Sequence, residues 1–392
     1  MTITNRWLLP EGIEEILPPK AIQLERLCRE IIDLFTTWGY EFVIPPMIEY
    51  LESLLTGTGE DLDLQTFKLT DQLSGRLMGF RADMTPQVAR IDAHLLKHDA
   101  PTRLCYLGSV LHTRPSKSGE TRSPLQLGAE LYGHAGVASD IEVVKLMLAT
   151  LKHVGIRQAY IDLGHIGIFR SLSAKSLLNE DQKTAVFETL QRKAKDELTS
   201  LLNDWKVSDV SSKAMVDLID MNGDVSVLKE AKKCFGKISK DIATDIKEIN
   251  ALVDSIEDQS NIKINIDLAE LRGYHYHTGM VYTAYTQGEG EGIAFGGRYD
   301  DIGKAFGRAR PATGFSTDVK SLLKFQKNNK APSRIFAPVS DDKVLNKKIE
   351  QLRTAGEIVV QQLKGQKVKA KEMNCDRQLV SEKGKWVVKK LN

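Results

Sequence analysis

The sequence predicts an α+β fold: a mainly antiparallel sheet flanked by helices, an all-helical insert, and a small C-terminal α/β module. Three observations predict this class. Strand-like segments up to residue 132 follow one another without the helical crossovers that a parallel sheet needs. Residues 169–258 lose strand character and keep a helical periodicity rich in Ala, Glu, Lys and Leu. Strand patterns then return, and a polar stretch with Asn-Asn and Pro precedes a basic C-terminal segment.

The first part of the chain begins with a helix and continues with short strands. Residues 20–37 have apolar side chains at helical spacing, and Gly39 ends this helix. A strand over residues 40–44 then precedes Pro45-Pro46. A hairpin follows, because the strands 66–69 and 76–81 flank a turn. The remaining predicted elements are a helix over 86–96 and strands over 104–111 and 124–132.

The later part returns to strands after the insert. We predict strands over 263–267 and 280–285, then a segment over 312–316 that leads into a helix ending near Leu323. The first domain therefore spans residues 1–325, a linker spans 326–333, and the C-terminal module spans 334–392. Within the module we predict strands over 334–339, 357–360 and 386–388 and a helix over 347–356.

Charge and composition exclude several classes of protein. The 392 residues carry 54 Lys and Arg against 52 Asp and Glu, so no global cationic field attracts nucleic acid. Residues 331–392 hold 14 basic and 7 acidic residues, whereas the first 330 hold 40 and 45. The chain has no apolar run of 18 residues, and its start lacks the pattern of a signal or transit peptide. We therefore expect a cytoplasmic protein without a membrane partner.

The cysteines are too scattered to form a metal or disulfide framework. Cys28, Cys105, Cys234 and Cys375 include no C-x-x-C pair. We expect reduced thiols in or near the core, with neither disulfides nor a bound metal.

Three polar clusters are candidates for a binding site. Arg272 lies among two His and two Tyr residues before a strand, Asp83 and Thr85 stand where a strand meets a helix, and Gln126 and Glu130 share one face of a strand. Each has an ordinary alternative, since the first cluster could be a surface turn and Thr85 a helix cap. A Gln and a Glu on a core strand are costly unless they bind something polar.

Together these side chains would suit a zwitterionic amino acid. The carboxylates of Asp83 and Glu130 offer acceptors for an ammonium group or an imidazole N–H, and Arg272 offers a bidentate partner for a carboxylate. Gln126 would bridge these groups.

The order of these segments resembles the catalytic domain of histidyl-tRNA synthetases, a class II synthetase fold, from about Leu8 to Phe325. The helix and strand ending at Pro46 are similar to the dimer-forming motif 1, and Phe80-Arg-Ala-Asp-Met-Thr85 is similar to the family's L-R-P-E-G-T. Residues 106–130 align with motif 2 and its following strand. Residues 271–282 and Gly296-Gly-Arg-Tyr-Asp300 match two histidine-specific segments, R-G-L-D-Y-Y-T-G and G-G-R-Y-D.

The departures from that family concern the binding of ATP. The family uses one arginine in motif 2 and another in motif 3, and this chain has His112 and Ser321 at those positions. Arg114 would replace the first arginine in a shifted register. Loss of a charge contact to a transition state costs about 3–4 kcal/mol, so the loss of two predicts no useful adenylation. His277 stands where the family has a second Tyr, and the C-terminal module is shorter than an anticodon-binding domain.

A chain that keeps the histidine pocket without these arginines resembles the HisZ family, the regulatory subunits of ATP phosphoribosyltransferase. The resemblance implies activation of a separate short-form catalytic subunit in the first step of histidine biosynthesis, and feedback inhibition by L-histidine. It implies motif 1 dimers within a hetero-octamer, no catalytic residue, no cofactor and no tRNA partner. The implied histidine-binding residues are Asp83, Thr85, His112, Gln126, Glu130, Arg272, Tyr276 and His277.

Two other functions remain open from the sequence. One is a divergent histidyl-tRNA synthetase, and the other is a synthetase-like module that senses uncharged tRNA through its basic C-terminal segment.

Overall fold

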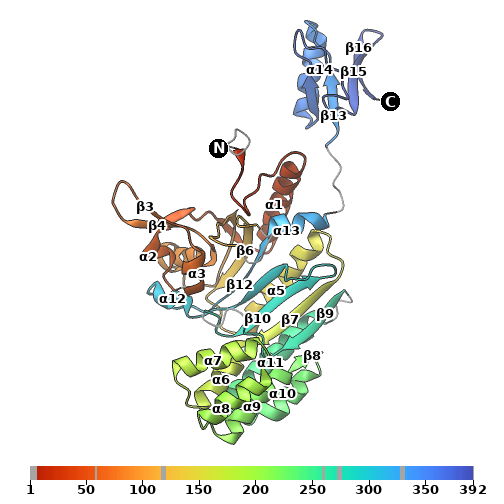
Figure 1. The fold of residues 1–392 in the computed structure, drawn as a ribbon. Coiled ribbons are helices and arrows are strands. Elements are labelled where there is room, and N and C mark those ends of the chain that lie inside the picture. The colour runs from red at the N-terminus through yellow and green to blue at the C-terminus, as the bar shows by residue number, and fades with distance from the viewer. Residues whose placement is uncertain are drawn as a thin grey trace. The chain divides into compact units, whose positions relative to one another are not determined.

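The computed structural model describes residues 7–57, 60–115, 121–257, 261–271, 276–326 and 332–391. The chain divides into two compact units, Met1–Lys327 and Asn328–Asn392. Figure 1 shows the large sheet and the helices of the first unit, and the small sheet of the second.

A nine-stranded sheet forms the centre of the first unit, in the order β1-β5-β6-β12-β11-β10-β7-β9-β8. Six of its eight strand pairs are antiparallel, which confirms the predicted class. The pair β1–β5 is parallel, so the expectation of local pairing up to residue 132 was wrong there, and the later pair β7–β9 is parallel as well. The long segments between these strands return the chain to the same end of the sheet. The strands are β1 Glu41–Val43, β5 Thr102–Ser109, β6 Leu125–Tyr132, β7 Ala159–His165, β8 Asn222–Gly223, β9 Ile262–Asp267, β10 Met280–Thr286, β11 Ala294–Arg298 and β12 Ala312–Asp318.

Helices α1 Lys20–Thr37 and α5 Val137–His153 pack on this sheet. Helix α1 begins and ends as predicted, because Leu24, Leu27, Ile31 and Phe35 form one buried stripe. The short helix α13 Val319–Leu322 and the 3-10 turn Leu323–Phe325 follow β12 and contact α1. The core around these helices also holds the Cys28 and Cys105 thiols, as expected, whereas Cys234 is exposed.

A second, three-stranded sheet lies beside the large one and contains the predicted hairpin. Its order is β2-β4-β3, from Ile48–Tyr50, Leu77–Phe80 and Lys68–Thr70, with both pairs antiparallel. Helices α2 Leu51–Leu54, α3 Glu60–Gln65, α4 Thr85–Arg90 and α12 Ile302–Ala305 belong to the same region. The predicted helix over 86–96 is α4 continued by a π-helical turn, Ile91–Leu96.

The helical insert, residues 166–256, lies between β7 and β9 and is drawn in yellow-green to green at the bottom of Figure 1. Its helices are α6 Ile166–Lys175, α7 Glu180–Gln191, α8 Lys195–Asp204, α9 Asp209–Asp220, α10 Val227–Phe235 and α11 Lys240–Ile256. The insert is not entirely helical, because Asn222–Gly223 forms strand β8 and extends the large sheet beside β9. An isolated Asn-Gly pair gives no strand pattern that a sequence reading would detect.

The second unit is a four-stranded sheet with one helix. The order is β14-β13-β15-β16, from Ile358–Gln361, Arg334–Ala337, Arg377–Glu382 and Lys385–Lys390, and helix α14 spans Lys343–Thr354. Strand β15 was not predicted from the sequence. The helix begins four residues before its predicted start, because the Asp342 side chain caps it by accepting from Val344 N–H. Within the described residues, no helix is long and apolar enough to cross a membrane.

Candidate functional site

A cavity of about 80 Å³ opens on the large sheet beside its central strands. It is lined by Asp83, Thr85, Glu130, Glu270, Tyr276, His277, Val281, Tyr282, Thr283, Phe295, Gly296, Tyr299, Gly314, Phe315 and Ser316. Most of these residues lie on four strands that are consecutive in the sheet, in the order β6-β12-β11-β10. Three carboxylates and several aromatic rings thus meet in one place.

Glu130 on β6 is the most deeply buried carboxyl of the cavity, with 1% of its surface exposed. It accepts hydrogen bonds from Tyr106 Oη at 2.9 Å and Thr85 Oγ1 at 3.2 Å, and a third from the Tyr299 hydroxyl. Burial raises the pKa of Glu130 to about 8, although the hydroxyl groups of Tyr299 and Tyr106 lower it. The ligand-free cavity therefore holds a carboxyl group that is mostly protonated at neutral pH.

Asp83 is held in place by Gln126. The Gln126 side chain donates to Asp83 Oδ1 at 2.7 Å and accepts from Met84 N–H at 2.9 Å. Thr85 N–H donates to the same Asp83 oxygen at 3.0 Å. The structure thus brings these two predicted residues into contact. Asp83 lines the cavity, whereas Gln126 is not part of the lining and holds the Asp83 side chain.

The segment before β10 forms another wall of the cavity. His277 is buried and Tyr276 is partly exposed, and their ring centroids lie 4.1 Å apart. Arg272, the predicted partner of a ligand carboxylate, lies outside the described residues.

Two glycines leave room for these side chains. A Cβ atom on Gly314 would lie 1.5 Å from Glu130 Oε2, and one on Gly297 would lie 2.8 Å from His277 Nε2. Both positions exclude any larger residue without a shift of the cavity wall.

Sequence reasoning missed Tyr106, Tyr299 and Glu270. Tyr299 lies within the Gly-Gly-Arg-Tyr-Asp segment and Tyr106 at the start of the motif 2 alignment, so both stood in recognised segments without an assigned role. Their contacts with Glu130 depend on strand pairing, because β5, which carries Tyr106, borders β6, and β11, which precedes Tyr299, is separated from β6 only by β12.

His112, by contrast, is not among the cavity-lining residues. Its Nε2 lies 2.9 Å from Ala82 O, its backbone N–H donates to Arg122 O at 2.8 Å, and its carbonyl accepts from Arg122 Nε at 3.0 Å. The Arg122 guanidinium also lies over the Phe67 ring, 5.1 Å from its centroid. The imidazole thus has a structural partner at the position where the sequence comparison places a motif 2 arginine.

Ser321 likewise has a local structural role. Asp318 accepts from Ser321 Oγ at 2.7 Å, caps helix α13, and also accepts from Leu125 N–H at 2.9 Å. The neighbouring Lys320 donates to Ser123 O at 2.6 Å. These bonds tie the end of β12 to the start of β6.

Two family models match different parts of the chain. Residues 12–322 match the model described as histidyl-tRNA synthetase, and residues 332–389 match the ATP phosphoribosyltransferase subunit HisZ C-terminal domain. The second model covers the C-terminal module and is described as a domain of an ATP phosphoribosyltransferase subunit, not of a synthetase.

Whole-chain relatives decide between the two descriptions. The ATP phosphoribosyltransferase regulatory subunit of Thioalkalivibrio sulfidiphilus is 53% identical over 392 residues, covering 99% of both chains. That of Chromohalobacter salexigens is 48% identical and covers 100% of both. The chain belongs to the family of ATP phosphoribosyltransferase regulatory subunits.

Solved structures agree with this membership in the regulatory-subunit family. A structure from Bacillus halodurans, titled as an ATP phosphoribosyltransferase regulatory subunit/histidyl-tRNA synthetase, has a TM-score of 0.81 at 27% identity, covering 95% of this chain and 97% of that one. The histidyl-tRNA synthetase of Nostoc sp. PCC 7120 has a TM-score of 0.76 at 19% identity, covering 95% and 91%, which shows the shared fold. Membership among regulatory subunits supports a non-catalytic role in histidine biosynthesis.

Proposed function

We propose that this chain activates a separate, short-form ATP phosphoribosyltransferase subunit and lowers that activity when L-histidine occupies the cavity beside Glu130. The observation that carries the proposal is the full-length identity to regulatory subunits together with a retained carboxylate-lined cavity. The complex would be a glycosyltransferase in which this chain contributes no catalytic residue and no cofactor. Its effect on the partner is a coupling free energy between two binding sites.

In this proposal each polar group of the ligand contacts a different cavity residue. Glu130 accepts an imidazole N–H from the ligand, and Asp83, oriented by Gln126, receives the α-ammonium. Arg272 takes the α-carboxylate, and Thr85, Tyr276 and His277 complete the walls. His112 is not among the residues that line the cavity, so its contact with the ligand stays a prediction.

The same proposal explains why the chain would not form an adenylate. His112 and Ser321, at the positions of the two ATP-binding arginines, have no guanidinium group. Both side chains also make local hydrogen bonds. Since each lost charge contact costs about 3–4 kcal/mol of transition-state stabilisation, a synthetase reaction at this site would be severely slowed.

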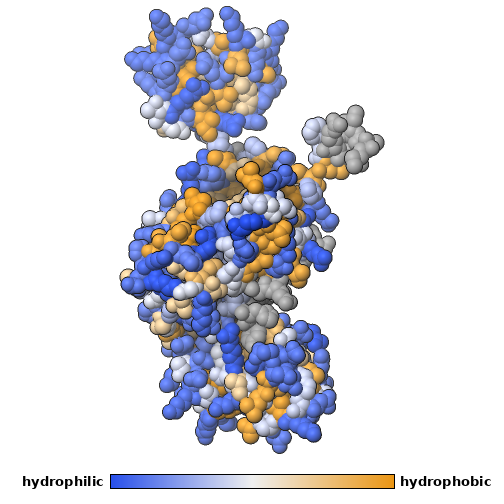
Figure 2. All heavy atoms as spheres, turned by 90° about the vertical axis from the view of Figure 1, so that its left-hand side faces the viewer, coloured by the Kyte–Doolittle hydropathy of each residue, from blue (hydrophilic) through white to orange (hydrophobic). Residues whose placement is uncertain are grey.

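Self-association through the motif 1 region belongs to the proposal, as dimers within a hetero-octamer of four regulatory and four catalytic chains. Strand β1 is the last strand of the large sheet, and a groove beside it is lined by apolar residues such as Leu24, Phe42 and Leu107. Figure 2 shows hydrophobic areas over the middle of the larger unit and a largely hydrophilic insert below them. An edge strand next to exposed apolar side chains is suited to pairing with a second copy.

The deciding experiment mixes the purified chain with a short-form catalytic subunit and measures phosphoribosyl-ATP formation with and without histidine. We expect activation by the chain and inhibition by histidine in the complex. Turnover that is unaffected by the chain would contradict the proposal.

A divergent histidyl-tRNA synthetase is the second candidate, favoured by the match of residues 12–322 to the synthetase model. Histidine-dependent exchange between ATP and pyrophosphate by the purified chain would establish it in place of the regulatory role. A tRNA sensor would instead show tight, salt-sensitive tRNA binding, which we do not expect from a nearly neutral chain.

A further inference from the structure

The cavity and the helical insert meet at the start of helix α6. Strand β7 runs directly into α6 at His165 and pairs along its length with β10, whose residues Val281 and Tyr282 line the cavity. At the junction, Ile166 N–H donates to Gly279 O at 2.9 Å. The insert therefore begins against the segment that leads from the cavity wall into β10.

Arg170, one turn further along α6, reaches the cavity wall itself. Its Nη2 donates to the backbone carbonyl of His277 at 2.8 Å. His277 has 6% of its surface exposed and lines the cavity. A guanidinium on a helix of the insert thus fixes the backbone of a cavity residue that lies 107 positions away in the sequence.

Helix α6 is in turn fixed to helix α11 through His165. The His165 Nδ1 accepts from Gly167 N–H at 3.2 Å and caps α6, and Nε2 lies 3.4 Å from Glu248 Oε2. Asp245 Oδ2 lies 3.6 Å from Nδ1, so two carboxyl groups of α11 flank one buried imidazole. His165, Asp245 and Glu248 resemble a metal-binding set in composition. Both ring nitrogens of His165 already serve these partners, so the arrangement favours a structural junction over an ion site.

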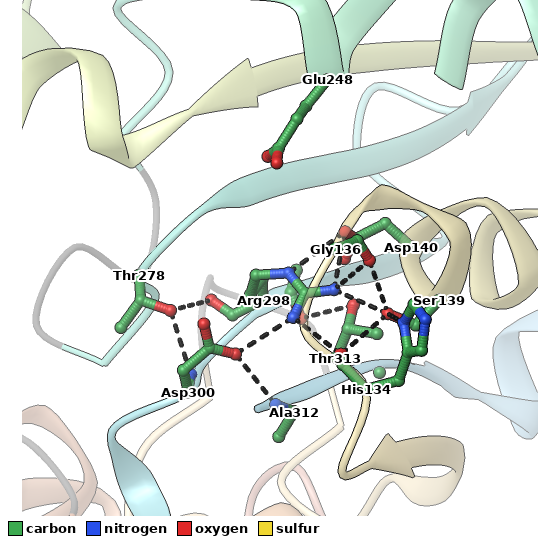
Figure 3. Close-up of polar contacts among 12 residues, drawn as sticks. His134, Gly136, Ser139, Asp140, Glu248, Thr278, Arg298, Asp300, Ala312 and Thr313 are labelled. Carbon is green, nitrogen blue, oxygen red and sulfur yellow. Dashed lines mark hydrogen bonds and ion pairs between the residues drawn. The ribbon is translucent and has the colours of Figure 1, made fainter. Parts of the chain in front are cut away.

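A second arginine, Arg298, contacts the same wall (Figure 3). Thr278 N–H donates to the backbone carbonyl of Arg298 at 2.7 Å, and the Arg298 guanidinium donates to Asp140 at 2.8 Å and to Gly136 O at 3.0 Å. Arg298 thereby connects the wall to helix α5, which packs on the large sheet. In the same view Glu248 extends from the insert toward this network.

From these contacts we propose that Arg170 is a positioning residue that couples the ligand cavity to the helical insert. The wall at residues 277–279 is held from the sheet by Arg298 and from the insert by Ile166 and Arg170, and of these last two only Arg170 makes its contact through a side chain. In this proposal a ligand that binds against His277 shifts the backbone carbonyl that Arg170 contacts. The shift is passed through Arg170 to α6 and from α6 to α11. Coupling is reciprocal, so the insert sets the ligand affinity to the same extent that the ligand alters the insert.

This inference rests on the proposed function, with histidine as the ligand, and is tested by calorimetry on the full chain. The variant Arg170→Gln removes the charge and the contact, and we expect histidine to bind about tenfold more weakly, as suits one charged hydrogen bond. The matched control is Arg192→Gln, which removes an equal charge from an exposed pair with Glu197 elsewhere on the insert. The control should bind histidine like the wild type.

Hydrogen exchange supplies the measurement that a merely structural role would not move. Histidine should slow amide exchange in α11 of the wild type and of Arg192→Gln, and this protection should be lost in folded Arg170→Gln. If Arg170→Gln does not fold, Arg170→Lys keeps the charge but places all its donors on one nitrogen of a shorter side chain, and about threefold weaker binding is expected. Wild-type affinity in folded Arg170→Gln, or in Arg170→Lys where that variant must serve, would overturn this inference alone. A wild-type chain that binds no histidine would overturn it together with the histidine part of the proposed function.

Discussion

Tyr106 donates a 2.9 Å hydrogen bond to Glu130, and the two residues are diagonal neighbours on the paired strands β5 and β6, where Gly128 lies opposite Tyr106. With the hydroxyls of Thr85 and Tyr299 also directed at it, the Glu130 carboxyl is surrounded by neutral donors. Such donors stabilise a carboxylate less than a cation would, so burial dominates and the pKa rises to about 8. The first prediction concerns this proton.

Glu130→Gln should stabilise the ligand-free chain increasingly as pH rises. The native wild type keeps a proton that the unfolded chain releases above about 4.5, so its unfolding free energy falls between that pH and about 8. Glutamine has no such proton to lose. Melting curves at several pH values should therefore show a difference between variant and wild type that grows from pH 5 to 8, and a difference independent of pH would contradict the raised pKa.

Gly314→Ala should distort the cavity, because Gly314 lines it beside Glu130. The added Cβ would lie 1.5 Å from Glu130 Oε2 and forces the carboxyl to move. Overpacking of this kind costs about 1–3 kcal/mol, and histidine binding should weaken with it. Denaturant unfolding and calorimetry would measure the two effects. Gly290→Ala is the matched control, since nothing lies within 4 Å of its Cβ, and equal losses in both variants would refute the steric explanation.

Elements with a one-sided apolar pattern could be predicted from the sequence, and evenly buried ones could not. Helix α1 has a single buried stripe and was predicted at its observed bounds. Helix α5 was missed, because it buries the polar Ser139, Asp140 and Thr150 along with its apolar residues, which blurs the periodicity. Its burial depends on partners such as Arg298, 158 positions away from Asp140.

The candidate site divides in the same way. Gln126 and Glu130 were identified because polar side chains on one face of a core strand are costly unless they bind something polar, and Asp83 because it stands where a strand meets a helix. The hydroxyls of Tyr106 and Tyr299 and the contact of Arg170 come from strand pairing and packing between distant segments, which local patterns do not contain. The contact of the His112 imidazole with the Ala82 carbonyl is likewise a property of the folded chain.

Asp140→Ala, on helix α5, should be among the most destabilising single changes in the first unit. Asp140 and Arg298 have 1% and 8% of their side chains exposed, and the change leaves a buried guanidinium with fewer partners. Breaking a buried pair costs about 3–5 kcal/mol, whereas an exposed pair is worth about 0–1 kcal/mol. Urea unfolding of Asp140→Ala beside Asp301→Ala, whose partner Lys304 is exposed, would measure this contrast. Similar midpoints for the two variants would show that the Asp140 pair is not important for stability.

Ile44→Asp should separate the proposed dimer into monomers. Ile44 follows strand β1 at the edge of the large sheet and is 78% exposed, next to the apolar groove lined by Phe42. A carboxylate there must lose its hydration if a second copy covers the edge, which costs several kcal/mol, but it costs little in a monomer. Light scattering should give twice the chain mass of 43.8 kDa for the wild type and a single mass for Ile44→Asp. Leu177→Asp changes an apolar residue on the insert that is even more exposed, at 92%, and should remain dimeric. A dimeric Ile44→Asp, or a monomeric wild type at micromolar concentration, would place self-association elsewhere or exclude it.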